Sequence, residues 1–210
     1  MSTFDLTKGF YQVPLSPESK GKTSFICPFG QFVYNVLPFG LQHSSSTFQR
    51  LMDGVLSGCE NFAKAYIDDI VVHSRTWEEH IAHVDAVLTK IQGAGLTVKP
   101  VKCKLAMRKV SFLGHEVGSG TINPMCDKIE AVSEFPRPLS KKNVRAFLGL
   151  TGYYRKFIAN FAAMAKPLTD LTKKNLPNTV SWNEECEVAF VAPGCSAKKM
   201  PDIKASTVKN

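Results

Sequence analysis

Apolar positions along the first 120 residues follow two different periods, which indicates strands and helices within one unit. Short runs of β-branched and aromatic residues mark the strands, and two pairs of runs fold back around turn residues as hairpins. Pro28, Phe29 and Gly30 form the turn of the first hairpin, and Asp68 and Asp69 lie at or near the turn of the second. Residues 4–15 open strand-like and then meet Gly9, and the other strand-like segments and hairpins are residues 23–37, 65–74, 96–98 and 110–117.

Two helices are expected between these strands. Residues 46–56 carry an apolar stripe that includes Phe48. A longer amphipathic helix is predicted after Thr76, which has the spacing of a capping box with Glu79. This helix ends at the glycines around residue 93.

The pattern changes after residue 120. The predicted helices are residues 127–134, one that begins after Ser140, and residues 160–172. Residues 191–210 have no periodicity and are predicted to be disordered or unrelated to the rest. The chain is therefore expected to have an α+β fold, in which antiparallel hairpins precede a helical part.

Composition narrows the class of protein. The chain has 210 residues, of which 44% are apolar and 21% charged, and this is the profile of a soluble globular protein. No apolar run approaches the roughly 18 residues that cross a membrane, and the N-terminus has no secretory pattern. The six cysteines are scattered, so neither a zinc site nor a disulfide framework is expected. These features predict an intracellular location, cytoplasmic or nuclear.

The net charge of +8 is unevenly distributed. Residues 99–156 hold 12 of the 26 Lys and Arg but only 4 of the 18 Asp and Glu, whereas residues 1–98 are slightly acidic. A basic segment behind an acidic one suits a polyanion that is bound beside a metal site. A solvated, lysine-rich helical surface explains the same charge, and charge alone favours that interpretation.

The adjacent carboxylates of Asp68 and Asp69 are the main candidate for chemistry. Aspartate is common in turns, so a polar hairpin tip is the simplest explanation. Metal binding is favoured by the apolar flanking strands, by the mutual repulsion of the two carboxylates, and by Asp5 in another strand-like segment. Three carboxylates of one sheet could hold two Mg²⁺ ions, which would serve a phosphoryl transfer.

Other candidate sites are weaker. His80 and His83 have the i, i+3 spacing that can bind a metal on a helix. No third ligand is near them in sequence, so a solvated helix face is expected. No arrangement of nucleophile and base for hydrolysis is apparent.

Five blocks of sequence resemble one family in the family's order. Y-I-D-D at residues 66–69 resembles the Y-x-D-D signature of reverse transcriptases. The other blocks are F-D-L-T-K-G-F-Y-Q-V-P-L at 4–15, L-P-F-G-L at 37–41 followed by T-F-Q-R-L-M-D at 47–53, F-L-G-H-E-V at 112–117, and F-L-G-L-T-G-Y-Y-R-K-F-I at 147–158. The chain is therefore similar to the reverse transcriptase region of a Gypsy/Ty3-type LTR retrotransposon (retrovirus-related) Pol polyprotein.

The resemblance implies an enzyme, an RNA-directed DNA polymerase that works by two-metal nucleotidyl transfer. Asp5, Asp68 and Asp69 would be its catalytic and metal-binding carboxylates. The implied cofactors are two Mg²⁺ ions, for which Mn²⁺ can substitute. The implied partners are an RNA or DNA template with a primer and deoxynucleoside triphosphates, with no membrane. The implied fold is a right-hand polymerase palm with partial fingers, followed by a helical thumb and connection.

The resemblance also implies roles for residues around the carboxylates. Those expected to contact the nucleotide are Phe10, Leu37, Pro38, Phe39, Gly40 and Lys102. Phe10 would stack beneath the incoming sugar and Lys102 would lie near the leaving pyrophosphate, although core packing for Phe10 and a surface position for Lys102 remain open. Those expected at the primer are Tyr66, Leu113 and Gly114. Tyr153 and Tyr154 could stack on bases, but they are expected simply to pack.

The resemblance implies four segments: a palm with remnant fingers at 1–120, thumb and connection helices at 121–180, the start of an RNase H-like region at 181–190, and the tail at 191–210. The chain begins close to the first aspartate block, before which the family has most of its fingers. We therefore expect a truncated or decayed copy that keeps the catalytic carboxylates. The alternatives are a non-catalytic, basic nucleic-acid-binding remnant and an inert gene product.

Overall fold

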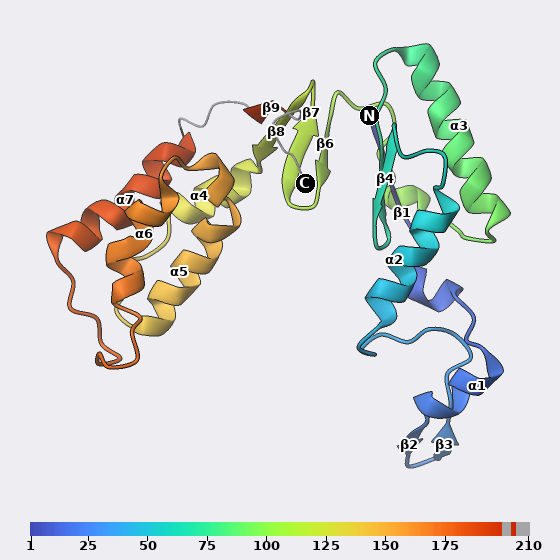
Figure 1. Cartoon of the computed structure of the whole chain (residues 1–210), viewed down its shortest axis with the longest axis horizontal. Coiled ribbons are helices and arrows are strands. Elements are labelled where there is room, and N and C mark those ends of the chain that lie inside the picture. Colours follow the sequence, from blue (N-terminus) through green and yellow to red (C-terminus); the bar gives the residue numbers. More distant parts are fainter. Residues whose placement is uncertain (199–202, 205–210) are drawn as a thin grey trace. The chain divides into compact units, whose positions relative to one another are not determined.

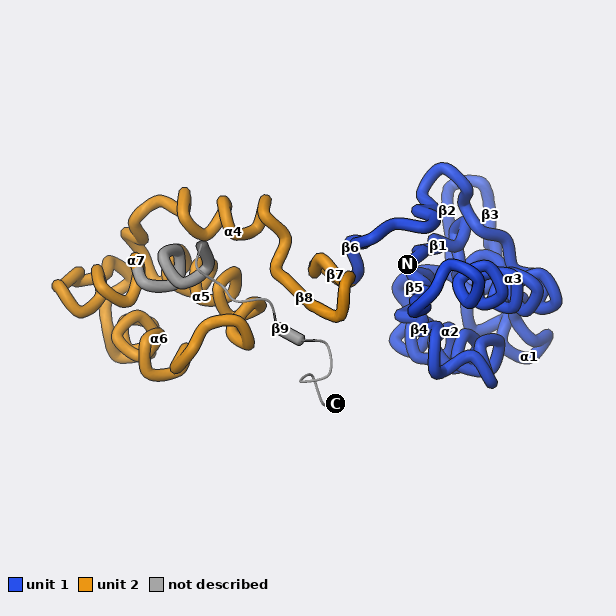
Figure 2. The backbone as a smooth tube through the Cα atoms, turned by 90° about the horizontal axis from the view of Figure 1, so that it is seen from above, with its two compact units in different colours: residues 1–112 blue, residues 113–210 orange. Residues whose placement is uncertain are grey.

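The structure is a computed structural model that describes the backbone of residues 1–198 and 203–204. The chain divides into two compact units, residues 1–112 and residues 113–210, which Figure 2 distinguishes by colour. The two units are taken separately below. No helix in the described part of the chain is both long and apolar enough to cross a membrane.

The first unit is built on a three-stranded antiparallel sheet. Its strands are β1 (Ser2–Asp5), β5 (Asp69–Val72) and β4 (Ala63–Tyr66), in the order β1-β5-β4. A separate hairpin is formed by β2 (Phe25–Cys27) and β3 (Gly30–Phe32), which pair in antiparallel register. Both predicted hairpins are therefore present, and the aspartates lie at the turn of the second.

Two long helices share one apolar core with the three-stranded sheet. They are α2 (Ser44–Val55) and α3 (Trp77–Gly93), which Figure 1 shows in cyan and green. The predicted capping box of α3 is confirmed, because the Glu79 N–H donates to Thr76 Oγ1 at 3.2 Å. The fully buried members of the core from sheet and helices include Phe48, Met52, Ile70, Val72 and Val87. Short elements complete the unit: η1 (Gly9–Gln12), α1 (Pro17–Lys20), η2 (Gly21–Thr23), η3 (Pro100–Lys102) and β6 (Lys109–Phe112).

Two predicted strands of this unit are shorter than expected. Residues 4–15 open as a strand, as expected, but β1 already ends at Asp5, because Lys8 takes a left-handed φ of 48° and a 3-10 helix follows. The strand predicted at residues 96–98 is reduced to a single bridge between Leu6 and Val98. At residues 96–98 a side chain takes the place of a partner strand, because the Thr97 N–H donates to Gln12 Oε1 at 2.6 Å and the Thr97 carbonyl accepts from Gln12 Nε2 at 3.0 Å.

The second unit combines a small sheet with a helical bundle. The strands β7 (His115–Gly118) and β8 (Thr121–Pro124) form a hairpin, and β9 (Ile203–Lys204) pairs with β8. The helices are α4 (Cys126–Ser133), α5 (Lys141–Tyr153), η4 (Arg155–Phe157), α6 (Phe161–Asp170) and α7 (Glu184–Lys198). The bundle core gathers Val132 of α4, Val144 and Phe147 of α5, Leu168 of α6, and Cys186 and Ala189 of α7.

Three expectations for this part of the chain need correction. The strand predicted over residues 110–117 is interrupted by a turn at residues 113–114, where two consecutive residues have positive φ. Residues 121–124 form a strand, although they were assigned to the helical part. Helix α7 continues through residues 191–198 and β9 forms at Ile203–Lys204, so these parts of the tail depart from the predicted disorder. The rest of that predicted tail, 199–202 and 205–210, lies outside the described residues.

Candidate active site

The sheet of the first unit brings the candidate carboxylates together. Asp5, the last residue of β1, lies directly opposite Asp69, the first residue of β5, and Asp69 also lies opposite Tyr66 of β4. Asp68 is in the two-residue turn before β5, and its carbonyl oxygen accepts a hydrogen bond from the Leu6 N–H at 3.1 Å. Like charges directly opposite each other destabilise a sheet, so this arrangement is costly unless a cation compensates.

The turn that carries Asp68 is strained and is held by a side chain of α2. Ile67 has a φ of 55°, in the left-handed region that β-branched residues rarely adopt. This conformation costs roughly 1–2 kcal/mol. Gln49 compensates, since its Oε1 accepts a hydrogen bond from the Ile67 N–H at 2.8 Å and its Nε2 donates to the Ala65 carbonyl at 3.1 Å. Strain that the surroundings hold in place is typical of functional sites.

Gly9 supports Asp68 through a close backbone approach. A Cβ added at Gly9 would lie 2.8 Å from Cζ of Phe48 and 3.2 Å from Cβ of Asp68. Phe48 is fully buried in the core, so it cannot swing into solvent to make room. Only a residue without a side chain therefore fits between the core and the aspartate turn.

The carboxylate of Asp5 is engaged by a lysine. Lys102 Nζ lies 2.9 Å from Asp5 Oδ2, with the lysine side chain 57% and the aspartate side chain 21% exposed. The backbone fixes this contact, because the Lys99 N–H donates to the Asp5 carbonyl at 2.7 Å. Thr3 and Lys104 exchange two further backbone hydrogen bonds at 2.8 and 3.0 Å. The segment that carries Lys102 thus lies along β1.

The charges of the other two aspartates act on Asp69. Burial raises the pKa of Asp69, and the charges of Asp68 and Asp5 raise it further, while Lys102 opposes them. The pKa of Lys102 is raised by its hydrogen bond to Asp5 and by the charges of all three aspartates. Carboxylate oxygens that lie near one another in this way are the donors that a hard divalent cation prefers.

The donor chemistry of the aspartates therefore fits Mg²⁺ or Mn²⁺. In the described part of the chain, however, no three His, Cys, Asp or Glu side chains are already gathered as a ligand set. The ion pair with Lys102 engages one carboxylate oxygen of Asp5.

The residues expected at the nucleotide fall into a buried and an exposed group. Phe10 is 8% exposed, and its ring centroid lies 5.0 Å from that of Phe39 and 5.1 Å from that of Phe48. Leu37 is buried, as is Pro38, whose carbonyl accepts a hydrogen bond from the Ser44 hydroxyl at 3.0 Å. Phe39 is 58% exposed, and Gly40 has a φ of 89°. Phe10 thus packs in the core with one side against an exposed aromatic ring.

The residues expected at the primer lie in different units. Tyr66 is half-exposed beside Asp69 in the first unit. Leu113 and Gly114 form the turn at the start of the second unit, with φ values of 47° and 69°. Tyr153 and Tyr154 at the end of α5 contact this turn, so they do more than fill space.

The basic segment is only partly available to a polyanion. Lys141 is 6% exposed, and its ammonium donates to the carbonyls of Lys173 and Leu176 at 2.5 Å. Arg137 lies over the Trp182 ring at 5.1 Å and pairs with Glu187. These two cations therefore stabilise the helical bundle.

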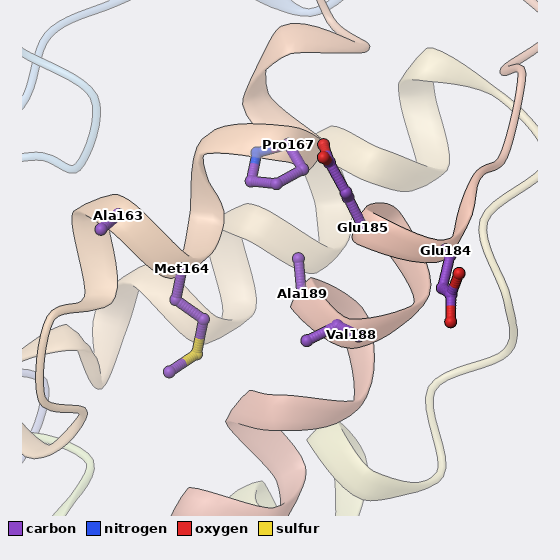
Figure 3. A pocket seen from close by; sticks show the side chains of 7 residues that line it. All are labelled: Ala163, Met164, Pro167, Glu184, Glu185, Val188 and Ala189. Atoms are coloured by element: carbon purple, nitrogen blue, oxygen red, sulfur yellow. The ribbon is translucent and has the colours of Figure 1, made fainter.

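A groove of about 420 Å³ lies between α6 and α7 (Figure 3). Its lining is mainly apolar and includes Met164, Pro167 and Val188. Two carboxylates, Glu184 and Glu185, also line it, and they belong to the first turn of α7. Acidic side chains in the first turn of a helix interact favourably with the helix dipole, so stabilisation of α7 is sufficient to explain both glutamates.

The predicted solvated face for the two histidines of α3 is wrong for His80. Its ring is buried, with Nε2 2.8 Å from the Ser2 hydroxyl and Nδ1 3.1 Å from the Ser74 hydroxyl. The Ser74 hydroxyl also lies 2.7 Å from Nδ1 of His83, and the His83 ring stacks on Phe62 at 3.8 Å. This polar cluster links the start of β1 to α3.

Gln49 and Gly9 are the supporting residues that sequence reasoning missed. Gln49 lies in the recognised T-F-Q-R-L-M-D block and Gly9 in the first aspartate block, so the blocks themselves were the available signal. The sequence alone does not show which backbone groups the side chain of a glutamine will bond, or which residues will pack closely against a glycine.

Comparison with known proteins identifies the family of this chain. A family model described as reverse transcriptase (RNA-dependent DNA polymerase) matches residues 1–117. The chain is 42% identical over 174 residues to the retrovirus-related Pol polyprotein from transposon 297 of Drosophila melanogaster, covering 82% of this chain and 16% of that protein. It is 40% identical over 185 residues to the enzymatic polyprotein of Cauliflower mosaic virus (strain NY8153), covering 88% and 27%. The chain therefore spans about a quarter or less of the length of these relatives.

Solved structures confirm the α+β fold. The foamy viral protease-reverse transcriptase dRH in complex with double-stranded DNA superposes with a TM-score of 0.89 at 25% identity, over 97% of this chain and 36% of that chain. The foamy viral protease-reverse transcriptase in complex with an RNA/DNA hybrid gives 0.87 at 25% identity, over 97% and 28%. With the family model matching more than half of its residues, the chain belongs to the reverse transcriptase (RNA-dependent DNA polymerase) family of retroelement Pol polyproteins.

Proposed function

We propose that this chain is the palm and thumb part of an RNA-directed DNA polymerase, with Asp5, Asp68 and Asp69 as the carboxylates that hold divalent cations. The observation that carries the proposal is the strand register, which sets Asp5 opposite Asp69 at the end of the sheet. The neighbouring Asp68 lies in a turn that Gln49 and Gly9 support. A sheet gains nothing from this pairing of like charges, whereas a metal site requires it.

Two Mg²⁺ ions held there would activate the primer 3′-hydroxyl and offset charge on the triphosphate, and Mn²⁺ could substitute. The aspartates would bind and orient that charge, with Asp69 the more peripheral ligand. Phe10, with Leu37, Pro38, Phe39 and Gly40, would form the surface beneath the incoming nucleotide. Lys102 would exchange its contact with Asp5 for the pyrophosphate oxygens.

The proposed partners are a primed RNA or DNA template and deoxynucleoside triphosphates, so the cytoplasm or nucleus is the expected place of action. Both foamy viral proteins named above are in complex with nucleic acid, which supports this class of partner. Tyr66, Leu113 and Gly114 would meet the primer. Basic residues of the second unit that are not used in the bundle would contact phosphates without regard to sequence.

A second candidate function is a non-catalytic nucleic-acid-binding remnant. It is favoured by the Lys102–Asp5 ion pair and by the absence of a formed ligand set among the described residues. In that case the aspartates would be neutralised by the protein itself. The net charge of +8 would then account for binding.

The test is primer extension on an RNA template with Mg²⁺ or Mn²⁺, together with Mn²⁺ binding measured calorimetrically without nucleotides. The variant for comparison is Asp68→Asn with Asp69→Asn. Extension and Mn²⁺ binding that both disappear in this variant are the expected result. If wild type and variant bind Mn²⁺ equally weakly and neither extends a primer, while both bind a primed template in a salt-dependent manner, the binding remnant is the correct function.

A further inference from the structure

Two adjacent tyrosines at the C-terminal end of α5 hold the turn that opens the second unit. The Tyr153 hydroxyl donates to the carbonyl of Leu113 at 2.6 Å, and the Tyr154 hydroxyl donates to the carbonyl of Gly114 at 2.9 Å. Forty residues separate each donor from its acceptor. Both carbonyl groups of the two-residue turn are thus bonded by one end of one helix.

The turn needs such support because its backbone is strained. Leu113 and Gly114 both have positive φ, 47° and 69°, as the central residues of a type I′ turn do. Glycine adopts this conformation freely, but leucine does so at a cost and is rarely found there. A Cβ added at Gly114 would lie 2.9 Å from the Tyr153 hydroxyl oxygen, so the turn and the tyrosine fit each other closely.

The aromatic surroundings fix the directions of the two phenols. The His115 ring, directly after the turn, stacks on Tyr153 at 5.4 Å with an interplanar angle of 13°. It meets Tyr154 edge-on at 5.6 Å and 86°. Tyr154 is 5% exposed and Tyr153 54% exposed, so one ring is locked in the unit and the other covers the turn from outside.

We propose that Tyr153 and Tyr154 are positioning residues for the Leu113–Gly114 turn, acting through their hydroxyl groups. The inference rests on the proposed function, in which this turn supports the primer terminus. Phenylalanine would pack against His115 equally well, but it could not bond the two carbonyls. On this proposal, two of the recognised sequence blocks form one structural unit that positions the primer end. They are F-L-G-H-E-V and F-L-G-L-T-G-Y-Y-R-K-F-I.

The first arm of the test reads the turn directly. Hydrogen exchange of the backbone amides around the turn is measured in the intact protein. Wild type is compared with Tyr153→Phe, Tyr154→Phe and the double variant. Loss of each hydrogen bond should speed exchange on the order of fivefold, and the double variant should show the larger effect. Thr151→Val is the matched control, because its hydroxyl bonds the Phe147 carbonyl at 2.9 Å within α5 and does not touch the turn.

The second arm reads primer placement. The double variant should raise the KM for a primed template about tenfold with a smaller change in kcat, and should lose the preference for a recessed 3′ end over a blunt duplex of equal length. Asp68→Asn should instead lower kcat and leave the exchange of the turn unchanged.

The outcomes separate the two ideas. Unchanged exchange in the double variant overturns the positioning role, and so does faster exchange with an unchanged KM and end preference. A wild-type chain that neither extends primers nor prefers recessed ends overturns the proposed function and with it the primer role. The exchange arm would still establish in that case whether the phenols hold the turn.

Discussion

Replacing Gly9 with alanine should disturb the core and the aspartate turn together. Gly9 has no positive φ that would itself penalise alanine, so the effect comes from contact alone. The new methyl carbon would lie 2.8 Å from Cζ of Phe48 and 3.2 Å from Cβ of Asp68, whereas ordinary carbon contacts lie near 3.5–4.0 Å. Either the buried ring or the aspartate must move by several tenths of an ångström. Overpacking of this kind costs about 1–3 kcal/mol.

The assay is urea unfolding, followed by Mn²⁺ binding and primer extension. Gly54→Ala in α2 is the control, because nothing lies within 4 Å of a Cβ added there. That variant should gain roughly 0.5–1 kcal/mol from the better helix propensity of alanine. Gly9→Ala should lose stability, and its Mn²⁺ affinity should fall with it. Equal or higher stability of Gly9→Ala, with Gly54→Ala behaving as expected, would refute the close packing on which the reasoning depends.

Two further predictions concern charge. Lys102→Met should raise the affinity for Mn²⁺ by up to about fivefold, the scale of an exposed ion pair, because the ammonium no longer competes for Asp5. The control Lys104→Met, on the same segment, should leave the affinity for Mn²⁺ unchanged, and calorimetric titration of both variants with Mn²⁺ tests this difference. Burial lowers the pKa of His80, helped by the N-terminal amine and His83, so the unfolded chain takes up this proton at a higher pH than the folded chain. The free energy of unfolding should therefore be highest above about pH 6.5 and fall as the pH drops below that value. In urea unfolding at a series of pH values, His80→Gln should make this fall less steep, and an equally steep fall in wild type and variant would contradict the role of His80.

Local pattern predicted the elements whose signals are local. The capping box placed the start of α3, and turn residues placed both hairpins of the first unit. Pattern failed where a few residues leave the strand conformation, as at the turn of Leu113 and Gly114. Gly114 is the only typical turn residue in this stretch, so the strand-like pattern continues on both sides of the turn.

The sequence by itself determined the family and the α+β class and marked the aspartates as candidates, because motif order and side-chain chemistry can be read along the chain. Only the tertiary structure decided that Asp5 stands opposite Asp69, that Lys102 bonds Asp5, and that Gln49 holds the strained turn. The Gln49 hydrogen bond to Ile67 joins residues 18 positions apart in the sequence, and the Lys102 hydrogen bond to Asp5 joins residues 97 positions apart. No periodicity of the sequence specifies which residues meet over such separations. Register and backbone approach arise from packing the whole unit, so they become visible only once the chain is folded.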